Sequence, residues 1–261
     1  MDIFDLKNKI SVVTGGYGHI GSGICLALLN RGSVVIVAGR SENKFNQKFQ
    51  GLENDRLFFK EIDISNSKSI DIFFAQIQKE YGRIDILFNN AHYVRGFEQV
   101  GISDEDWAYT MEGVLGSVHK CIRAVVPIMK ENGSGKIINI SSMYGVVSPN
   151  FELYQGEDCE KYTNPPHYGA AKAGIVQLTK YFASYLGKHN INVNSITPGP
   201  FPKEQIQIDN PEFIERLKNR NPLNKIGRPE DIQGVSLLLA SSASDFITGQ
   251  NFIIDGGWTI W

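Results

Sequence analysis

The residues whose chemistry is easiest to interpret are Tyr168 and Lys172, in the segment Tyr168-Gly-Ala-Ala-Lys172. Apolar residues at helical spacing follow Tyr168, so the two side chains should share one face of a helix, one turn apart. A free phenol has a pKa of about 10, and a nearby ammonium would lower that pKa and favour proton transfer near neutral pH. Such a pair on an exposed helix can also be a coincidence, so its interpretation depends on the rest of the chain.

A second candidate site is the glycine-rich segment Thr14–Gly21, with glycines at positions 15, 16, 18 and 21. It lies between a short apolar segment, 10–13, and an apolar helical pattern. Glycine allows a tight turn and a close approach to a pyrophosphate, whose charge then lies at the helix N-terminus. The context predicts a nucleotide site; a tight turn without a ligand is the alternative.

The elements that must position these residues alternate along the chain. Apolar runs predict strands over 10–13, 34–38, 57–62, 84–88, 136–140, 191–196 and 252–254. Helical periodicity predicts helices after the glycine segment and over 67–81, 104–129, 168–188, 211–219 and 229–240. Apolar strands that alternate with helices form parallel sheets covered on both faces, so we expect one α/β domain over residues 1–261.

Composition and charge narrow the class of protein. A net charge of -2 gives no sign of binding to nucleic acid or to an anionic membrane. No apolar run is long enough for a membrane helix, and the N-terminus does not resemble a secretory signal. The three scattered cysteines fit a reducing cytoplasm, and the absence of a His/Cys cluster predicts no metal site.

Taken together, the motifs of the chain resemble the classical short-chain dehydrogenase/reductase family. They follow the family's order: Thr14-Gly15 with Gly21, Asp63-Ile64, Asn89-Asn90-Ala91, Ser141-Ser142 with Gly145, Tyr168 with Lys172, Pro198-Gly199, Gly227-Arg-Pro-Glu-Asp231, and Asp255-Gly256-Gly257. The resemblance implies a Rossmann-type, doubly wound, seven-stranded parallel sheet in a three-layer α/β/α arrangement. It also implies an NAD(P)-dependent oxidoreductase that interconverts a secondary alcohol and a ketone.

The resemblance implies roles for individual residues. Tyr168 would be the acid/base, Lys172 would lower its pKa and bind the nicotinamide ribose, and Ser142 would hydrogen-bond to the substrate oxygen. Asn90 would contact the cofactor and Asp63 the adenine edge, with a turn-forming role as the alternative for both. The expected cofactor-binding residues are Gly15, Tyr17, Gly18, His19, Ile20, Gly21, Arg40, Asp63, Ile64, Asn90, Tyr168, Lys172, Pro198 and Gly199.

The choice of cofactor depends on the end of the second expected strand. An acid there would bind the ribose 2′-hydroxyl of NAD, whereas an arginine suits the 2′-phosphate of NADP. The chain has Gly39-Arg40-Ser41, with no acid. NADP(H) is therefore favoured, and NAD(H) stays open because Arg40 could be a solvated charge or stack on adenine.

Four positions depart from the family pattern. His19 replaces a glycine and gives a spacing closer to the extended branch, which holds epimerases and dehydratases. His92 also replaces a glycine, and each histidine could touch a ligand or simply pack within its loop. Gly113 lies where the family has an asparagine that holds a water of the proton relay, so the relay would be rewired or impaired. Lys203 replaces a cofactor-binding threonine.

The largest departure is an insertion within Val147–His167, which makes the spacing between Ser142 and Tyr168 about twice the usual one. Both of its ends lie at catalytic positions, so we expect it over or beside the active site. Its polar and aromatic residues suit a small, polar, sugar-like substrate; a solvated loop or a subunit contact is the alternative. A similar insertion occurs in oxidoreductases of nonulosonic-acid and flagellin-glycan pathways.

Two other functions stay open at this point. One is a catalytically impaired NAD(P)-binding sensor or partner protein, and the other is an epimerase- or dehydratase-like enzyme that retains its cofactor. The family implies a homotetramer, with a homodimer as the alternative. The apolar end Trp258-Thr-Ile-Trp261 suggests burial at a subunit interface.

Overall fold

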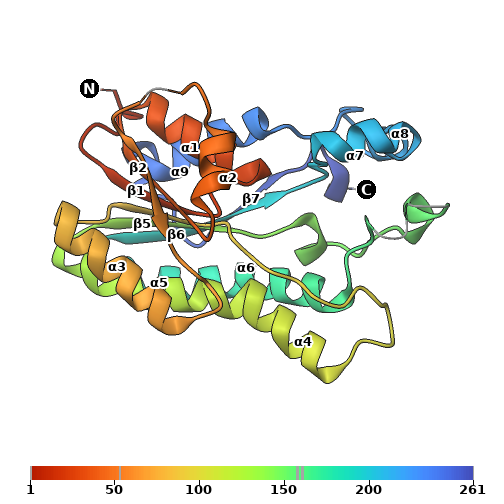
Figure 1. Ribbon diagram of the computed structural model, residues 1–261, viewed down its shortest axis with the longest axis horizontal. Coiled ribbons are helices and arrows are strands. Elements are labelled where there is room, and N and C mark those ends of the chain that lie inside the picture. The colour runs from red at the N-terminus through yellow and green to blue at the C-terminus, as the bar shows by residue number, and fades with distance from the viewer. Residues whose placement is uncertain (1, 53, 157–158, 160–161, 261) are drawn as a thin grey trace.

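The protein is described by a computed structural model that covers residues 2–52, 54–156, 159 and 162–260. Its centre is a parallel seven-stranded sheet in the order β3-β2-β1-β4-β5-β6-β7 (Figure 1). The strands are β1 Ile10–Thr14, β2 Val34–Gly39, β3 Leu57–Glu61, β4 Ile86–Asn89, β5 Gly135–Ile140, β6 Ile191–Pro198 and β7 Asn251–Ile254. The predicted Rossmann-type, doubly wound sheet is confirmed.

Helices cover both faces of the sheet, so the three-layer arrangement is also confirmed (Figure 1). One face is covered by α1 His19–Asn30 and α9 Gln233–Ala240, and the other by α3 Ser67–Tyr81, α5 Ser117–Glu131 and α6 Pro166–Leu186. The remaining helices are α2 Glu42–Lys48, α4 Asp104–Met111, α7 Glu204–Asp209 and α8 Pro211–Asn219. Buried apolar side chains form a cluster on each face, as expected for a parallel sheet that is covered on both sides.

The long helix expected over 104–129 is interrupted. A π-helical turn, Glu112–Gly116, separates α4 from α5. A Cβ atom at Gly113 would lie 2.3 Å from the backbone oxygen of Tyr93, so the helix packs directly on the loop after β4. Side-chain periodicity alone cannot reveal this contact, and π-turns are frequent at functional sites.

The short helices α2 and α7 were missed because their segments lack apolar periodicity. Tertiary contacts stabilise α2 instead: the Phe45 ring lies 5.3 Å from that of Phe49 and 5.7 Å from that of Phe59. Ser41 caps its N-terminus by accepting a bond from the Lys44 N–H at 3.3 Å.

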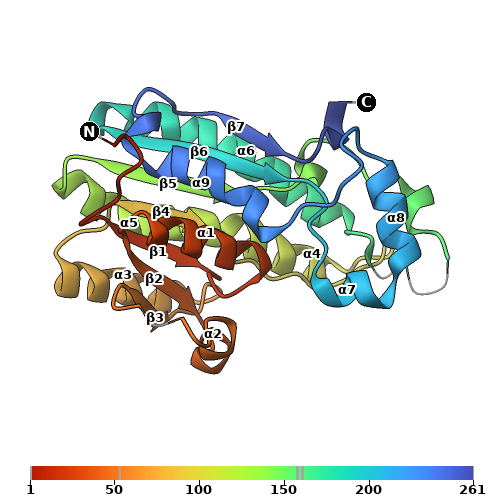
Figure 2. The same ribbon diagram turned by 90° about the horizontal axis from the view of Figure 1, so that it is seen from above.

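The insertion packs against the rest of the protein. A 3₁₀ turn over Phe151–Tyr154 lies beside α8 (Figure 2). The Arg216 guanidinium of α8 donates to the backbone oxygens of Leu153 at 3.1 Å and Gln155 at 3.3 Å. The described part of the insertion is thus a packed wall. Residues 157, 158, 160 and 161 lie outside the described ranges.

Candidate active site

The glycine loop forms the floor of a nucleotide-sized groove at the carboxyl ends of β1, β2 and β4. Gly15 has a left-handed φ of +64°, and a Cβ atom at Gly21 would lie 2.4 Å from the Gly15 oxygen. No side chain caps α1 at Gly18, and its first turn holds no acid. Its free N–H groups can therefore bind an anion such as a pyrophosphate.

The groove is a cavity of about 460 Å³, and most of the expected cofactor-binding residues line it. Those that do are Gly15, Tyr17, Gly18, His19, Ile20, Arg40, Asp63, Ile64 and Asn90. Gly21 does not line the groove but lets the helix pack against the loop. The chain order reverses between β1 and β4, which is where open parallel sheets bind ligands.

Asn90 and Asp63 have structural contacts of their own. The Asn90 Nδ2 donates to the oxygens of Thr14 at 2.9 Å and Gly15 at 3.1 Å, which ties the glycine loop to β4. The Asp63 carboxylate accepts the N–H and hydroxyl of Ser65, and the backbone bond is the main cause that lowers the pKa of Asp63. Both residues thus shape the groove through turns while they line it.

The adenosine end of the groove carries Tyr17 and Arg40. The Tyr17 ring covers Gly39, and its hydroxyl accepts the Arg40 N–H at 3.1 Å. The Arg40 side chain is exposed. His19 lies at the start of α1 with a buried, unpartnered Nε2 atom. Burial and then Lys48 lower the pKa of His19, which favours the neutral form of its ring.

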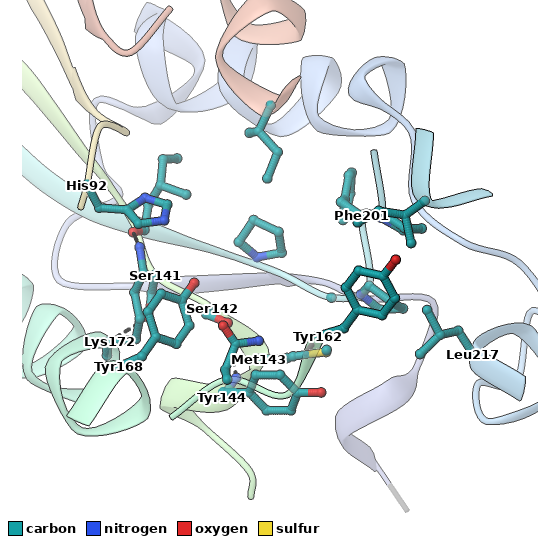
Figure 3. A pocket seen from close by; sticks show the side chains of 18 of the residues that line it. His92, Ser141, Ser142, Met143, Tyr144, Tyr162, Tyr168, Lys172, Phe201 and Leu217 are labelled. Carbon is teal, nitrogen blue, oxygen red and sulfur yellow. Dashed lines mark hydrogen bonds between the residues drawn. The ribbon is translucent and has the colours of Figure 1, made fainter. Parts of the chain in front are cut away.

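Tyr168, Ser142 and Lys172 meet in a second cavity of about 280 Å³ that also includes Pro198 and Gly199 (Figure 3). The Ser142 Oγ accepts the N–H of Tyr144 at 3.2 Å, and its hydroxyl is hydrogen-bonded to Tyr168. The Lys172 Nζ donates to the Ile140 oxygen at 2.9 Å. The expected catalytic residues thus come together at the ends of β5 and β6.

The expectation that Lys172 lowers the pKa of Tyr168 is wrong. Burial raises the pKa of Tyr168, and the bond to Ser142 opposes this effect. Lys172 is 2 % exposed, and burial lowers its pKa to about 7. Because Lys172 is only partly protonated near pH 7, it does little to lower the pKa of Tyr168, although its Nζ atom lies 5.5 Å from the centre of the Tyr168 ring.

The two cavities share the residues Ile20, Asn90, His92 and Phe201, so a ligand in the groove reaches Tyr168. This arrangement fits a dinucleotide whose reactive end lies beside a phenol, a hydroxyl and an ammonium. It can hold a carbonyl or hydroxyl oxygen next to a proton donor while hydride is exchanged at the adjacent carbon.

Comparison with known proteins agrees with this geometry. The family model described as enoyl-(acyl carrier protein) reductase matches residues 17–259. A 3-oxoacyl-(acyl-carrier-protein) reductase of Chlamydia muridarum is 35% identical over 97% of this chain and 98% of its own. A 2-dehydro-3-deoxy-D-gluconate 5-dehydrogenase of Dickeya dadantii is 30% identical, over 99% of this chain and 98% of its own length.

The solved gluconate 5-dehydrogenase of Burkholderia cenocepacia, in complex with NADP and tartrate, superposes with a TM-score of 0.87. It is 27% identical and covers 100% of this chain and 98% of its own. The chain belongs to the short-chain dehydrogenase/reductase family. It is an NAD(P)-dependent oxidoreductase that interconverts a secondary alcohol and a ketone.

The relay position of the short-chain dehydrogenase/reductase family is closed in this chain. The Gly113 oxygen accepts the Ser117 hydroxyl at 2.8 Å, and Tyr93 fills the space that an asparagine side chain would need. His92, on the same loop, lines both cavities, with its ring 5.9 Å from that of Tyr168. The protein atoms packed around His92 remove part of its water and lower its pKa, and the charge of Lys172 lowers it further. By surface area, His92 is nevertheless an exposed residue.

Lys203 and His167, the last residue of the range that holds the insertion, lie at different places. Lys203 lines the cofactor groove. His167 is fully buried, with its Nε2 atom 3.0 Å from the Arg95 oxygen and its ring stacked on Trp107, so it does not face the substrate cavity. The sequence also gave no signal for the α8 residues that line that cavity, Phe213 and Leu217, because they lie far from every motif.

Within the described ranges, no helix is long and apolar enough to cross a membrane. In the same part of the chain, no group of three or more His, Cys, Asp or Glu side chains could hold a metal ion.

Replacing Lys172 by Met should stabilise the ligand-free protein near neutral pH. The pKa of about 7 lies below that of a free lysine, so the unfolded chain holds more protons between about pH 7 and about pH 10. The parent's free energy of unfolding should therefore rise with pH across this window, and the variant should lack this slope. At about pH 7, the free energy of unfolding of the variant should exceed that of the parent by about 2 kcal/mol. This figure already allows for the lost hydrogen bond to the Ile140 oxygen.

Urea unfolding at several pH values measures this effect. Lys188→Met, at an exposed position just after α6, is the matched control and should keep the parent's dependence on pH. Parallel profiles for Lys172→Met and the parent would show that Lys172 is not a destabilising buried charge.

Proposed function

We propose that Tyr168, Ser142 and Lys172 are the catalytic residues of this oxidoreductase. The observation that carries the proposal is their convergence in one cavity that opens on the cofactor groove. A bound nicotinamide supplies or accepts the hydride. Ser142 would hold the substrate oxygen through its hydroxyl, and Tyr168 would give or take the proton at that oxygen.

The electrostatics of the cavity determine the protonation state in which Tyr168 would start the reaction. Because burial raises the pKa of Tyr168, the phenol is protonated near neutral pH, and its proton would pass to the substrate oxygen as negative charge develops there. Lys172 would bind the ribose hydroxyls with the N–H groups that Ile140 leaves free. The intact set of three residues argues against a sensor without catalysis.

Replacing Tyr168 by Phe should abolish turnover, by at least about 1,000-fold, and leave cofactor affinity within about 3-fold, because only the proton donor is lost. Turnover is followed by nicotinamide absorbance with a panel of secondary alcohols and ketones, and binding by the fluorescence of bound NADPH. Tyr185→Phe, an exposed position on the same helix, is the control. A variant with activity close to the parent would exclude Tyr168 as the acid/base.

We also propose NADP(H) as the cofactor. Arg40 is exposed at the end of β2, where an acid would select NAD, and so it can pair with a 2′-phosphate. The Burkholderia gluconate 5-dehydrogenase binds NADP, whereas a short-chain dehydrogenase of Leptospira borgpetersenii, 29% identical with a TM-score of 0.85, binds NAD+. That NAD+ complex covers 98% of this chain and 94% of its own.

Replacing Arg40 by Ala should weaken NADPH binding by about 10- to 100-fold, because a charge-assisted bond to the 2′-phosphate is lost. NADH, which lacks that phosphate, should lose at most about 3-fold. Titration of cofactor fluorescence gives both constants, and Arg123→Ala on α5 is the control. Equal losses for the two cofactors would refute the preference for NADP.

The substrate that we propose is small, polar and sugar-derived. The cavity of about 280 Å³ is small for a ligand site, and the insertion closes its far side. The relatives from Dickeya dadantii and Burkholderia cenocepacia carry names that refer to sugar-derived substrates.

We propose that residues 1–261 act as one catalytic domain and assemble as a homotetramer in the cytoplasm. The continuous sheet supports a single catalytic domain. The three free, buried cysteines support a cytoplasmic location. Exposed apolar side chains support assembly: Trp107, Tyr181, Ile253 and Ile260 are 45%, 62%, 40% and 77% exposed. Trp258 is buried within its own chain, so its burial needs no partner, and Trp261 lies outside the described residues.

Replacing Ile260 by Asp should reduce the molar mass of the assembly, because a carboxylate cannot be buried at an apolar contact without a partner. Light scattering measures the mass. Ile72→Asp, an equally apolar exposed position on α3 with 47% exposure, is the control. If Ile260→Asp keeps the parent's mass, the C-terminal end is not part of the interface.

A further inference from the structure

The wall of the substrate cavity that lies opposite Tyr168 is aromatic. In Figure 3, His92 and Tyr168 lie on one side of the cavity, and Tyr162 and Leu217 on the other. The aromatic residues that line it are Tyr144, Tyr154, Tyr162, Phe201 and Phe213. They come from the loop after β5, the insertion, the segment before α7, and α8, so this wall combines four separate parts of the chain.

Ring contacts and hydrogen bonds hold this aromatic wall in place. The Tyr162 ring is stacked on Phe213 at 5.3 Å between centroids, and Tyr154 contacts the same ring at 5.4 Å. The hydroxyls of Tyr144 and Tyr154 are hydrogen-bonded to each other. Asn210 donates to the Tyr162 hydroxyl at 2.9 Å. The wall therefore presents fixed, flat surfaces without the entropy cost of ordering long side chains.

The described part of the cavity lining offers little charge for a charged substrate group. Its one Lys or Arg is Lys172, which already donates to Ile140. Arg216 lies 5.9 Å from the centre of the Phe213 ring, and its N–H groups donate to the insertion. Lys203 lines the cofactor groove, where phosphate charge would compete for it. The described lining also includes no Asp or Glu.

Against the described lining, a substrate carboxylate would lose its water and find one cation, Lys172, which already donates to Ile140, so its burial is costly. A substrate ammonium would find no Asp or Glu among the same described residues. Neutral hydroxyl groups fare better, because Asn164 is half-buried in the same lining and can both donate and accept hydrogen bonds. Flat aromatic faces suit the apolar face of a ring more closely than an extended chain.

We infer that the substrate is an uncharged cyclic alcohol or ketone whose ring lies against the aromatic wall, with its carbonyl oxygen at Ser142 and Tyr168. This inference rests on the proposed function and specifies its substrate class. In the reductive direction, the carbonyl carbon accepts hydride from NADPH and its oxygen accepts the Tyr168 proton. The products are the ring alcohol, NADP+ and a phenolate that solvent reprotonates. An open-chain hydroxy acid has no ring to lie against the aromatic wall, and it carries a negative charge near neutral pH.

The test compares cyclohexanone derivatives that differ only in charge: 4-hydroxycyclohexanone and 4-oxocyclohexanecarboxylate. Each is titrated into the NADPH complex, with binding read from cofactor fluorescence and turnover from nicotinamide absorbance. The neutral ketone should bind at least about 100-fold more tightly than the carboxylate. Equal affinities, tighter binding of the carboxylate, or binding of neither would overturn the inference. Preferential binding of the neutral ketone without turnover would leave the inference standing and count against the proposed catalysis.

Two variants probe the wall directly. Tyr162→Leu keeps an apolar side chain but removes the flat face, and should weaken binding of the neutral ketone by about 10-fold. Asn164→Lys adds a cation, and should raise the affinity for the carboxylate by about 10-fold or more. Phe246→Ala, at a fully exposed position outside the lining of both cavities, is the control. If both variants keep the parent's ratio of affinities for the neutral ketone and the carboxylate, the wall does not contact the substrate.

Discussion

The site depends on the contact between α6 and the end of β5. The buried Lys172 Nζ donates to the Ile140 oxygen at 2.9 Å, and the Ser141 hydroxyl donates back to the Lys172 oxygen at 2.8 Å. A Cβ atom at Gly145 would lie 2.7 Å from the Lys172 backbone, so the loop and the helix touch. This reciprocal pair places Ser142 and Tyr168 in one cavity. It also keeps an ammonium away from water, which accounts for its lowered pKa.

The cofactor groove is built from a similar cross-strand bond. Asn90 at the end of β4 holds the glycine loop through two backbone oxygens, so its amide shapes the groove before any ligand is present. The loop in turn leaves the N-terminus of α1 uncapped. A groove that is organised in this way requires little rearrangement to accept a pyrophosphate, which favours affinity.

The substrate side is organised by a different principle. Its wall is aromatic, it is held by contacts between the insertion and α8, and its chemistry is neutral. The polar side chains of the proposed catalytic residues lie on one side of the cavity, and the aromatic wall lies on the other. The closed relay position at Gly113 and the neighbouring His92 show that the loop after β4 also departs from the family pattern, through steric packing on the π-helical turn.

The sequence alone determined the parallel α/β fold and the position of the glycine loop, because these depend on local periodicity and on glycine spacing. It also predicted the set Ser142, Tyr168 and Lys172, through the resemblance of its motifs to those of the family. Only the tertiary structure decided the direction of the pKa shift of Tyr168, since burial and distance are not encoded in spacing. The same holds for the aromatic wall: Tyr162 and Phe213 are stacked although they are remote in the chain. Contacts between remote segments arise from packing, and no local pattern predicts them.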